Sequence, residues 1–289
     1  MISVWGGIAA VASVVGFAVP LSIGSGLPAS ATPTGRIIYN ATSQTGVQSD
    51  IYSASPAGTG VTKLTHGTGE SFAGSYSPQR GRIAFVRGGV TGRLWTMTAT
   101  GTDARPLGSG SLAGSCPRYS PAGGRIAYRT GDFGEIHMVN ADGTHDRRIS
   151  GTATTYDQCP SWSPDGTRLA FVRYSSFSSA DVWVMRDDGT HATRLTTDGV
   201  LKSAVAWSPD GRTIAYDRGG DLWLTAPTGR DQHALTETAG TESDPVWSPH
   251  SDQIVYAYAQ GPSFVLRIID AHGRWTKAVG VAGSPAAWH

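Results

Sequence analysis

Charged side chains are scarce in this 289-residue sequence, and the two signs are almost balanced. Asp, Glu, Lys and Arg together make up 16% of the chain, and 23 basic residues against 22 acidic ones give a formal net charge of +1. Proteins that bind nucleic acid or anionic membranes through their overall charge carry a clear basic excess. We therefore expect no nucleic-acid partner, and any charge-based recognition has to be local.

The N-terminal region lacks charge altogether, since the first charged residue is Arg36. Within it, Ile8 to Val19 form an apolar run, and Ala29-Ser30-Ala31 supplies the small residues that precede a cleavage site. This pattern predicts a secretory signal peptide over residues 1–31, although a basic n-region is missing. An uncleaved anchor is the alternative, for which the run is short.

The missing features of this region also bear on where the protein resides. No cysteine follows the apolar run, which argues against a lipid anchor. We expect an exported protein, secreted or periplasmic, with no membrane span once the signal peptide is removed.

What the sequence does contain is a repeat. The stretch WSPDGTRLAFVR begins at Trp162, and WSPDGRTIAYDR begins at Trp207. Ser-Pro-Asp-Gly is typical of a tight chain reversal, and the alternating apolar residues after it are typical of a strand. Weaker copies keep the same register, with an aliphatic residue seven positions after the aromatic one. The aromatic residues, spaced 40 to 45 positions apart, are Tyr76, Tyr119, Trp162, Trp207 and Trp247.

Each copy continues beyond the Ser-Pro-Asp-Gly turn in the same order. A second apolar patch follows, then a turn that contains glycine, and then a short last strand. A repeat of about forty residues with four strands has the size of one β-propeller blade.

The two ends of the chain each carry part of a repeat. Ile37-Ile38-Tyr39 begins the last three strands of a copy, but Ser30 stands where the aromatic residue belongs. Ser284 to Trp288 match a first strand alone. Joining the two parts removes unpaired strand edges. The sequence therefore predicts an all-β fold over residues 32–289: a six-bladed β-propeller of four-stranded antiparallel blades, closed by the C-terminal inner strand against the N-terminal strands.

Three features of the repeat together resemble the TolB-type propeller repeat. They are the aromatic-Ser-Pro-Asp-Gly turn, the Ile-Ala-Phe or Ile-Ala-Tyr strand, and the turn Asn140-Ala-Asp-Gly143. The resemblance covers residues 35–289 and implies a propeller that binds a protein or peptide partner. Prolyl-oligopeptidase-like peptidases also contain such propellers, but their chemistry needs a G-x-S-x-G motif. The sequence has no such motif, so we do not expect peptidase activity.

Only two cysteines are present, Cys116 and Cys159. They are 43 residues apart, and each stands before a proline and three positions before a repeat aromatic residue. Adjacent blades would therefore carry them at equivalent places near the channel mouth. An even cysteine count in an exported protein favours a disulfide. A Cα separation above about 7 Å would instead leave two buried thiols, and the sequence leaves both alternatives open.

The order of the turns predicts two different faces. The Ser-Pro-Asp-Gly and Asn-Ala-Asp-Gly turns are short and lie at one end of the strands, whereas longer, variable connections lie at the other end. Variable loops on a rigid scaffold usually carry function. The residues that we expect to bind a ligand or partner around the channel mouth on this loop-rich face are Glu70, Arg118, Asp157, Gln158, Lys202, Glu242 and Asp244.

Arg118 is unusual in its repeat position. The other copies hold small or aliphatic residues there: Ser75, Ser161, Ala206, Val246 and Ala287. One interpretation is a contact with a ligand. The other, which we favour, is a pair with Asp157 or Asp244, because a buried charge requires a partner.

The sequence indicates no cofactor, metal site or catalytic residue. His145, His191 and His272 fall in or beside the short turns, and Asp187-Asp188 lacks the spacing of a calcium loop. No nucleophile and base can be paired from the sequence.

Two functional hypotheses follow. The first is an exported, monomeric, non-enzymatic propeller that binds a protein or peptide of the cell envelope or exterior on its loop-rich face. The second is a small-molecule hydrolase, lyase or cyclase at the channel mouth, with Asp157, Glu242 or Asp244 as acid or base. Exposed aromatic residues such as Phe133 and Phe177 would favour the first. A perturbed carboxylate in a deep apolar pocket would favour the second.

Overall fold

The computed structural model describes residues 35–42, 48–67, 69–79, 81–89, 92–108, 112–130, 134–151, 155–259 and 264–289. The expected signal peptide, residues 1–31, and Phe133 lie outside these ranges. The regular elements in the described ranges are β-strands. No helix that could cross a membrane is found there.

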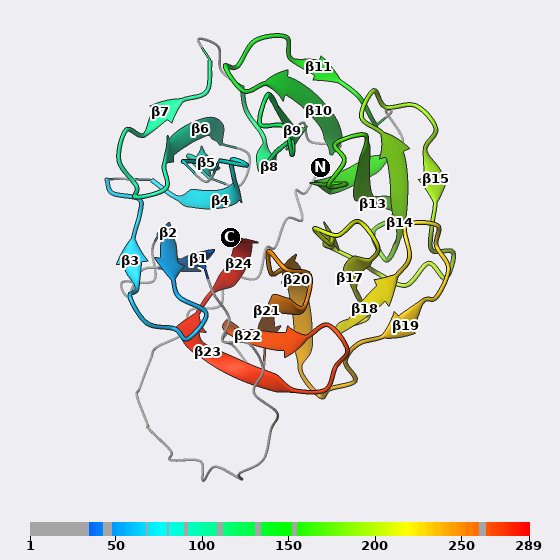
Figure 1. Ribbon diagram of the computed structural model, residues 1–289. Coiled ribbons are helices and arrows are strands. Elements are labelled where there is room, and N and C mark those ends of the chain that lie inside the picture. The colour runs from blue at the N-terminus through cyan, green and yellow to red at the C-terminus, as the bar shows by residue number, and fades with distance from the viewer. Residues whose placement is uncertain are drawn as a thin grey trace, which may run out of the picture.

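Six antiparallel sheets of four strands each form the blades of a ring (Figure 1). In every blade one strand lies nearest the ring axis and one lies outermost. The outermost strand has two residues in five blades and seven in the sixth. In the blade that contains both chain ends, the C-terminal strand is innermost. Inner strands of neighbouring blades contact one another around the ring. The predicted six-bladed propeller is confirmed.

The first three blades, each given from the inner to the outer strand, have the following bounds. Blade 1 contains β24 (Ser284–Trp288), β1 (Ile37–Thr42), β2 (Ser49–Ala54) and β3 (Thr62–Lys63). Blade 2 contains β4 (Ser71–Tyr76), β5 (Arg82–Arg87), β6 (Arg93–Thr98) and β7 (Arg105–Pro106). Blade 3 contains β8 (Ser115–Tyr119), β9 (Arg125–Thr130), β10 (Glu135–Asn140) and β11 (Arg147–Arg148).

The remaining three blades follow in chain order. Blade 4 contains β12 (Tyr156–Trp162), β13 (Arg168–Ser176), β14 (Ser179–Arg186) and β15 (Thr193–Arg194). Blade 5 contains β16 (Val205–Trp207), β17 (Ile214–Arg218), β18 (Asp221–Thr225) and β19 (His233–Ala234). Blade 6 contains β20 (Thr241–Trp247), β21 (Gln253–Ala259), β22 (Phe264–Asp270) and β23 (Thr276–Ala282).

The two ends of the described chain close the ring in blade 1. Strand β24 pairs antiparallel with β1, and Ile37 lies opposite Trp288. Beyond the strands, the Arg36 N–H donates to the His289 carbonyl at 2.8 Å, and the His289 N–H donates back at 3.1 Å. This confirms that the C-terminal strand supplies the inner strand of the first blade.

The Ser-Pro-Asp-Gly turn has a clear local cause. Between β12 and β13 the Gly166 N–H donates to the Ser163 carbonyl at 2.9 Å, and the Asp165 carboxylate accepts from the Thr167 N–H at 3.0 Å. Gly166 has a φ of 69°, a conformation that glycine adopts without a steric penalty. The turn returns the chain directly along the blade, which leaves this face of the ring with short connections.

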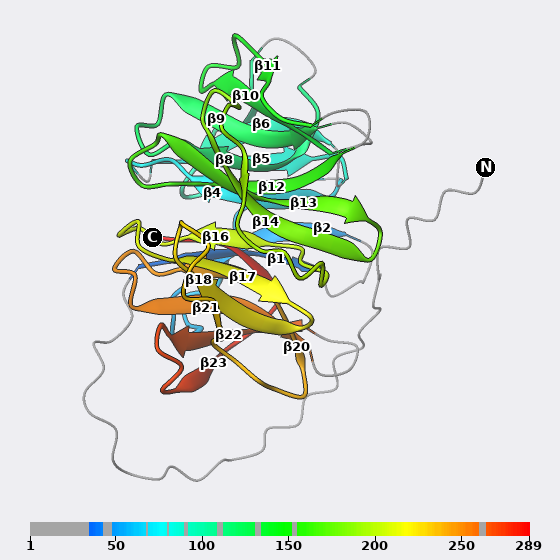
Figure 2. The ribbon, with the colours of Figure 1, turned by 90° about the vertical axis from the view of Figure 1, so that its right-hand side faces the viewer.

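The two faces of the ring are visible from the side (Figure 2). The C-terminus and the short turns lie at the left edge, and the hairpin that joins β13 and β14 lies at the right edge. We call these the turn face and the loop-rich face.

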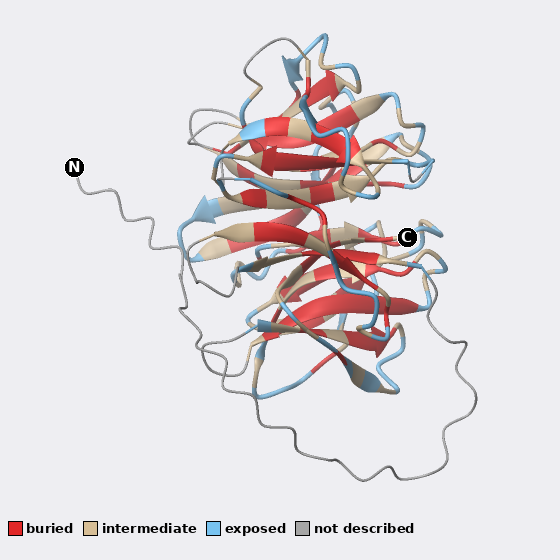
Figure 3. Ribbon diagram, turned by 90° about the vertical axis from the view of Figure 1, so that its left-hand side faces the viewer, coloured by how far each residue is buried: buried red, intermediate tan, exposed pale blue. Residues whose placement is uncertain are grey.

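The hydrophobic core lies between the blades. One cluster, for example, packs Ala127 and Ile136 of blade 3 against Trp162, Leu169 and Phe171 of blade 4. Figure 3 shows buried residues along the strands and exposed residues at the turns and outer edges. The repeated aromatic residues therefore belong to a core that is divided among the blade interfaces.

Candidate functional site

The inner strands are irregular at a shared level near the axis. A β-bulge interrupts the pairing of β4, β8, β12 and β20 with their neighbours, shortly before the repeat aromatic residue. Cys116 and Asp244 occupy equivalent positions there and have φ values of 52° and 53°. Bulges change the direction in which a side chain points. These two side chains are therefore set by a backbone conformation that regular strands do not have.

Polar side chains from blades 3 to 6 gather around this level. They come from inner strands, from the second strands beside them, or from the start of blade 4. We call them the axial cluster, which consists of Arg118, Arg129, Tyr156, Gln158, Tyr174, Asp217 and Asp244.

Arg118 reaches across the ring axis. Its Nη1 donates to the Ala286 carbonyl of blade 1 at 2.9 Å and also to the Gly74 carbonyl of blade 2. Burial lowers the pKa of Arg118 to about 10, and the negative charge of Asp244 opposes this change. Of the two acids expected as partners, Asp244 interacts electrostatically with Arg118, whereas Asp157 binds a different arginine.

Asp217 and Asp244 form a pair of carboxyl groups that influence each other. Asp217 accepts hydrogen bonds from the Ser203 N–H at 3.0 Å, the Ser203 hydroxyl at 2.7 Å and the Ala204 N–H at 2.6 Å. Burial nevertheless raises the pKa of Asp217 to about 6, and Asp244 adds to the rise. Asp244 is half-buried and accepts from the Ser284 hydroxyl at 2.6 Å. The cluster thus holds a carboxyl group that titrates near neutral pH.

Arg129 forms the blade 3 side of the cluster. The residue is 6% exposed, and its guanidinium donates to the Tyr156 hydroxyl at 2.5 Å and to the Ser115 hydroxyl at 3.4 Å. Its buried Nε has no hydrogen-bond partner in the described chain. Tyr156 packs edge to face on Tyr174 at a centroid distance of 5.4 Å. Burial raises the pKa of Tyr174, and Asp217 contributes to that rise.

Asp157 lies in an internal ion pair. Its side chain is fully buried, and the Arg173 Nε and Nη2 donate to its two carboxylate oxygens at 2.6 Å and 2.8 Å. The Ser150 hydroxyl also donates to it at 2.6 Å. Asp157 and Arg173 are opposite each other in the β12–β13 ladder, so this pair stabilises blade 4.

Lys202 is likewise enclosed by the protein. Its side chain is fully buried, and its ammonium donates to the Asp198 carboxylate at 2.6 Å and to the Ala180 and Val200 carbonyls at 3.1 Å and 2.8 Å. The ammonium group therefore has its donors satisfied by the connection between blades 4 and 5.

Glu242 lies in the inner strand of blade 6 and contacts blade 5. The Thr236 and Thr238 hydroxyls, which follow the last strand of blade 5, donate to its carboxylate. Asp157 has the equivalent position in blade 4 and accepts from the Ser150 hydroxyl, which follows the last strand of blade 3, at 2.6 Å. The repeated contact indicates that Glu242 holds blades 5 and 6 together.

The two other expected binding residues differ in position. Gln158 hydrogen-bonds the Tyr174 side chain and belongs to the axial cluster. Glu70 lies beside Gly89 in the β5–β6 connection. In the described ranges no hydrogen bond or ion pair of the Glu70 side chain joins it to that cluster.

Cys116 and Cys159 are joined by a disulfide. Their Cα atoms are 5.3 Å apart, inside the limit of about 7 Å for a bridge. The disulfide connects the inner strands of blades 3 and 4 beside the axial cluster.

The sequence analysis missed four members of the cluster: Arg129, Tyr156, Tyr174 and Asp217. A signal for two of them was present, because Arg129 and Asp217 occupy the same position of the second strand. The other blades hold an amide or an apolar residue there: Asn40, Val86, Val172 and Ala257. A comparison of second strands, made as for Arg118, would have identified both.

No metal centre accompanies the cluster in the described ranges. No group of three or more His, Cys, Asp or Glu side chains is placed there to hold a metal ion. In the Asp187-Asp188 turn, Asp187 pairs with Arg125 at 2.7 Å and Asp188 accepts from Thr190.

Solved structures with similar folds include two TolB proteins. Putative TolB from Agrobacterium tumefaciens matches with a TM-score of 0.69 and 18% identity, over 88% of this chain and 92% of that chain. TolB from Acinetobacter baumannii matches with a TM-score of 0.71 and 20% identity, over 89% of this chain and 67% of that chain. Identities this low show similarity of fold alone.

Sequence comparison gives one local match and one family match. An uncharacterized peptidase, YuxL of Bacillus subtilis (strain 168), is 35% identical over 77 residues, which are 25% of this chain and 11% of that protein. The chain thus spans about a tenth of the length of this curated relative. Residues 105–288, more than half of the chain, match the TolB beta propeller domain family (PD40). The repeat, the six blades and this match together show that the chain belongs to the TolB beta propeller family.

Proposed function

We propose that the chain is an exported, non-enzymatic propeller that binds a protein or peptide partner on its loop-rich face. The support is the distribution of exposed apolar side chains. Four large apolar residues are exposed in the described ranges. Phe177 and Leu201 lie in connections on the loop-rich face, and Phe264 begins strand β22 at the same face. Exposed apolar groups that share one face are typical of interaction surfaces.

Phe177 is the observation that carries this proposal. It is fully exposed at the tip of the hairpin between β13 and β14, the longest pair of paired strands in any blade. The hairpin is supported close to its tip, since Gly199 of the next connection lies against Ser179. An aromatic residue on a rigid support loses little entropy on binding and is a frequent anchor of interfaces.

Site-specific photo-crosslinking tests the proposal. Benzoylphenylalanine replaces Phe177 in one protein and Arg230, an exposed residue of the turn face, in the control. After irradiation with the exported fraction of the source cells, we expect a discrete adduct at position 177 and none at position 230.

The captured partner then allows a quantitative measurement. The double variant Phe177→Ser, Leu201→Ser should bind the purified partner at least about tenfold more weakly, because aromatic anchors commonly contribute 2 kcal/mol or more. Both residues are exposed, so melting should be unchanged. Equal adducts at both positions, or an unchanged affinity, would contradict the proposal.

The second candidate function is a small-molecule hydrolase, lyase or cyclase at the axial cluster. The observation that favours it is Asp217, whose pKa of about 6 and neighbour Asp244 suit general acid and base roles. Asp157 and Glu242, the other acids considered from the sequence, are taken up by internal contacts.

A panel of esters, glycosides and uronate oligosaccharides separates the two functions. Turnover that is lost in Asp217→Asn and Asp244→Asn but kept in Phe177→Ser would support the enzyme. Partner binding that is lost in Phe177→Ser but kept in Asp217→Asn and Asp244→Asn would support the first proposal.

A further inference from the structure

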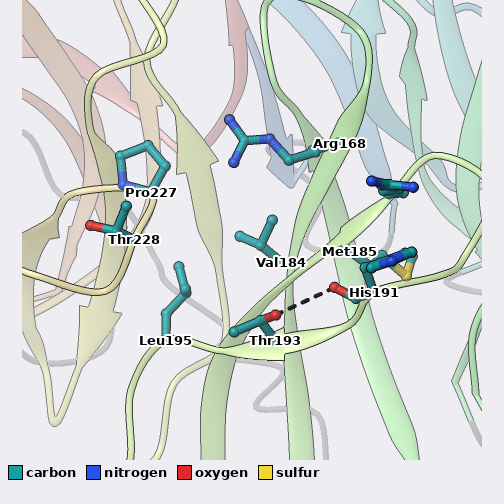
Figure 4. Close-up of a pocket in the computed structure, with 9 residues that line it drawn as sticks. Arg168, Val184, Met185, His191, Thr193, Leu195, Pro227 and Thr228 are labelled. Atoms are coloured by element: carbon teal, nitrogen blue, oxygen red, sulfur yellow. Dashed lines mark hydrogen bonds between the residues drawn. The ribbon is translucent and has the colours of Figure 1, made fainter.

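A separate cavity opens on the turn face between blades 4 and 5. It has a volume of about 220 Å³ and is lined by residues of β13, β14 and β15 and by the turn at Pro227-Thr228. Figure 4 shows Val184 at its centre, with Arg168 above it, Pro227 on one side and His191 on the other. The cavity lies on the turn face of the ring, whereas Phe177 lies on the loop-rich face.

The floor and the rim of the cavity differ in chemistry. Val184 and Leu195 are 5% and 7% exposed and form an apolar floor. Arg168, Arg186 and His191 stand around them. A site with a hydrophobic floor and a few convergent polar groups is the usual construction of a small-ligand pocket.

The two arginines have no direct acidic partner in the described chain. Arg168 stacks on the ring of Trp207 at 4.9 Å, and neither it nor Arg186 makes an ion pair. The acids that interact electrostatically with them are held in their own turns. Asp165, which interacts with Arg168, accepts from the Ser163 hydroxyl at 2.5 Å and the Thr167 N–H at 3.0 Å. Asp188, which interacts with Arg186, accepts from the Thr190 hydroxyl and N–H at 2.7 Å and 2.8 Å. Asp188 interacts electrostatically with His191 as well. Its carboxylate is nevertheless held within its own turn by the hydrogen bonds from Thr190.

We propose that this cavity binds a carboxylate that is attached to a short branched aliphatic group. The planar guanidinium groups match a carboxylate, and the floor of Val184 and Leu195 matches the aliphatic part. A volume of about 220 Å³ lies below the range of roughly 300–1,000 Å³ that drug-sized ligands need. The ligand therefore has the size of one side chain. It is either a free small acid or the C-terminal leucine-like residue of a peptide.

This site is independent of the partner surface proposed above. Both sites involve blade 4, but the cavity lies on the opposite face of the ring and takes an anionic ligand. Failure of either proposal leaves the other intact, since Phe177→Ser does not change the cavity and Arg186→Gln does not change the loop-rich face.

Calorimetric titration with 4-methylpentanoate tests the proposal. We expect the acid to bind the wild-type protein and its neutral counterpart, 4-methylpentanamide, to bind at least about tenfold more weakly, as loss of one charge-assisted contact predicts. The peptide Gly-Gly-Leu, with a free or an amidated C-terminus, forms the second arm. Binding of the free acid alone identifies a small-acid site, and binding of the free but not the amidated peptide identifies a site for a chain terminus.

Three variants make the test specific. Arg186→Gln removes an exposed cation of the rim and should weaken binding about tenfold, whereas Arg230→Gln, on the same face outside the cavity, should not. Thr228→Phe fills the opening without a change of charge and should abolish binding with unchanged melting. The proposal is overturned if acid and amide bind equally, if inorganic phosphate binds as tightly as the acid, if Arg186→Gln binds like wild type, or if neither acid nor peptide binds.

Discussion

At the scale of single residues, Asp217 is the only acid at its position of the second strand in the six blades. Val86, Val172 and Ala257 occupy that position in three blades, and Asn40 and Arg129 occupy it in the other two. A buried carboxylate there costs free energy even with its hydrogen bonds from Ser203 and Ala204, which is why its pKa rises to about 6. Such a residue is retained at the expense of stability, as is common at functional sites.

The raised pKa of Asp217 predicts how stability depends on pH. The folded pKa of about 6 exceeds the ordinary aspartate pKa of 3.8, so the native state binds the proton more tightly than the unfolded chain. The contribution of the protonated group is complete below about pH 4 and is lost as pH rises through 6. The loss amounts to as much as about 3 kcal/mol.

Urea unfolding of wild type and Asp217→Asn at pH 4, 5, 6 and 7 measures this effect. The variant cannot ionise, so its free energy of unfolding relative to wild type should increase between pH 4 and about pH 6 and level off by pH 7. A difference that does not change with pH would contradict the assignment.

Asp157 supports a second prediction at this scale. Asp157→Ala leaves Arg173 without its partner in a fully buried ion pair, and such losses cost about 3–5 kcal/mol. Because Arg173 is 20% exposed, we expect the lower end of that range. The exposed Asp231→Asn is the control and should change the free energy of unfolding by no more than about 0.5 kcal/mol. An unaltered denaturation midpoint for Asp157→Ala would speak against the pair.

At the scale of elements, the bulged inner strands position side chains near the ring axis, and the hairpins position residues at the surface. The bulges direct Cys116 and Asp244 near the axis, whereas the long β13–β14 ladder, which has a register shift between Tyr174 and Ser176, carries its hairpin tip to the loop-rich face. The bridge between Cys116 and Cys159 joins two inner strands that have no ladder of hydrogen bonds with each other. The disulfide therefore links blades 3 and 4 at a place where no backbone hydrogen bonds of a sheet connect them.

The disulfide gives a prediction for blades 3 and 4. Breaking the bridge should lower the free energy of unfolding by about 2–4 kcal/mol, because the unfolded chain gains freedom. Thermal melting with and without a reductant measures this change. The double variant Cys116→Ser, Cys159→Ser should have the melting temperature of the reduced wild-type protein, and the reductant should not change it. Non-reducing peptide mapping of the protein purified without reductant should recover the linked peptides, and finding only free thiols would count against the bridge.

At the scale of the whole molecule, ring closure is the decisive contact. Strand β24 contacts β1, β4 and β20, so one five-residue strand completes three neighbouring blades. Trp288 belongs to the core between blades 6 and 1 and is 8% exposed. Loss of this strand would open two blade interfaces at once.

Closure predicts a graded series of variants. Trp288→Ala should cost about 3–5 kcal/mol, as for other buried aromatic residues. Deletion of residues 285–289 should abolish cooperative unfolding, because typical domains have only about 5–15 kcal/mol of stability. Circular dichroism melting of both variants measures this, and a deletion variant that melts cooperatively would exclude the closure mechanism.

The sequence by itself determined the repeat, the blade number and the closure. Turns such as Ser163 to Gly166 and the periodic aromatic residues act locally or at a fixed spacing, so a linear pattern records them. The same spacing placed Cys116 and Cys159 at equivalent points of adjacent blades. It also singled out Arg118 as an exception to its column.

Only the tertiary structure decided which polar residues meet. Asp157, Lys202 and Glu242 sit at loop-rich positions in the sequence, but each is enclosed by partners from other strands. Asp217 approaches Asp244, and Arg168 and His191 border one cavity, because distances across blades depend on bulges and on the closed ring. A repeat fixes the position of a residue within its blade, whereas its contacts depend on side chains of the next blade, which the repeat does not specify.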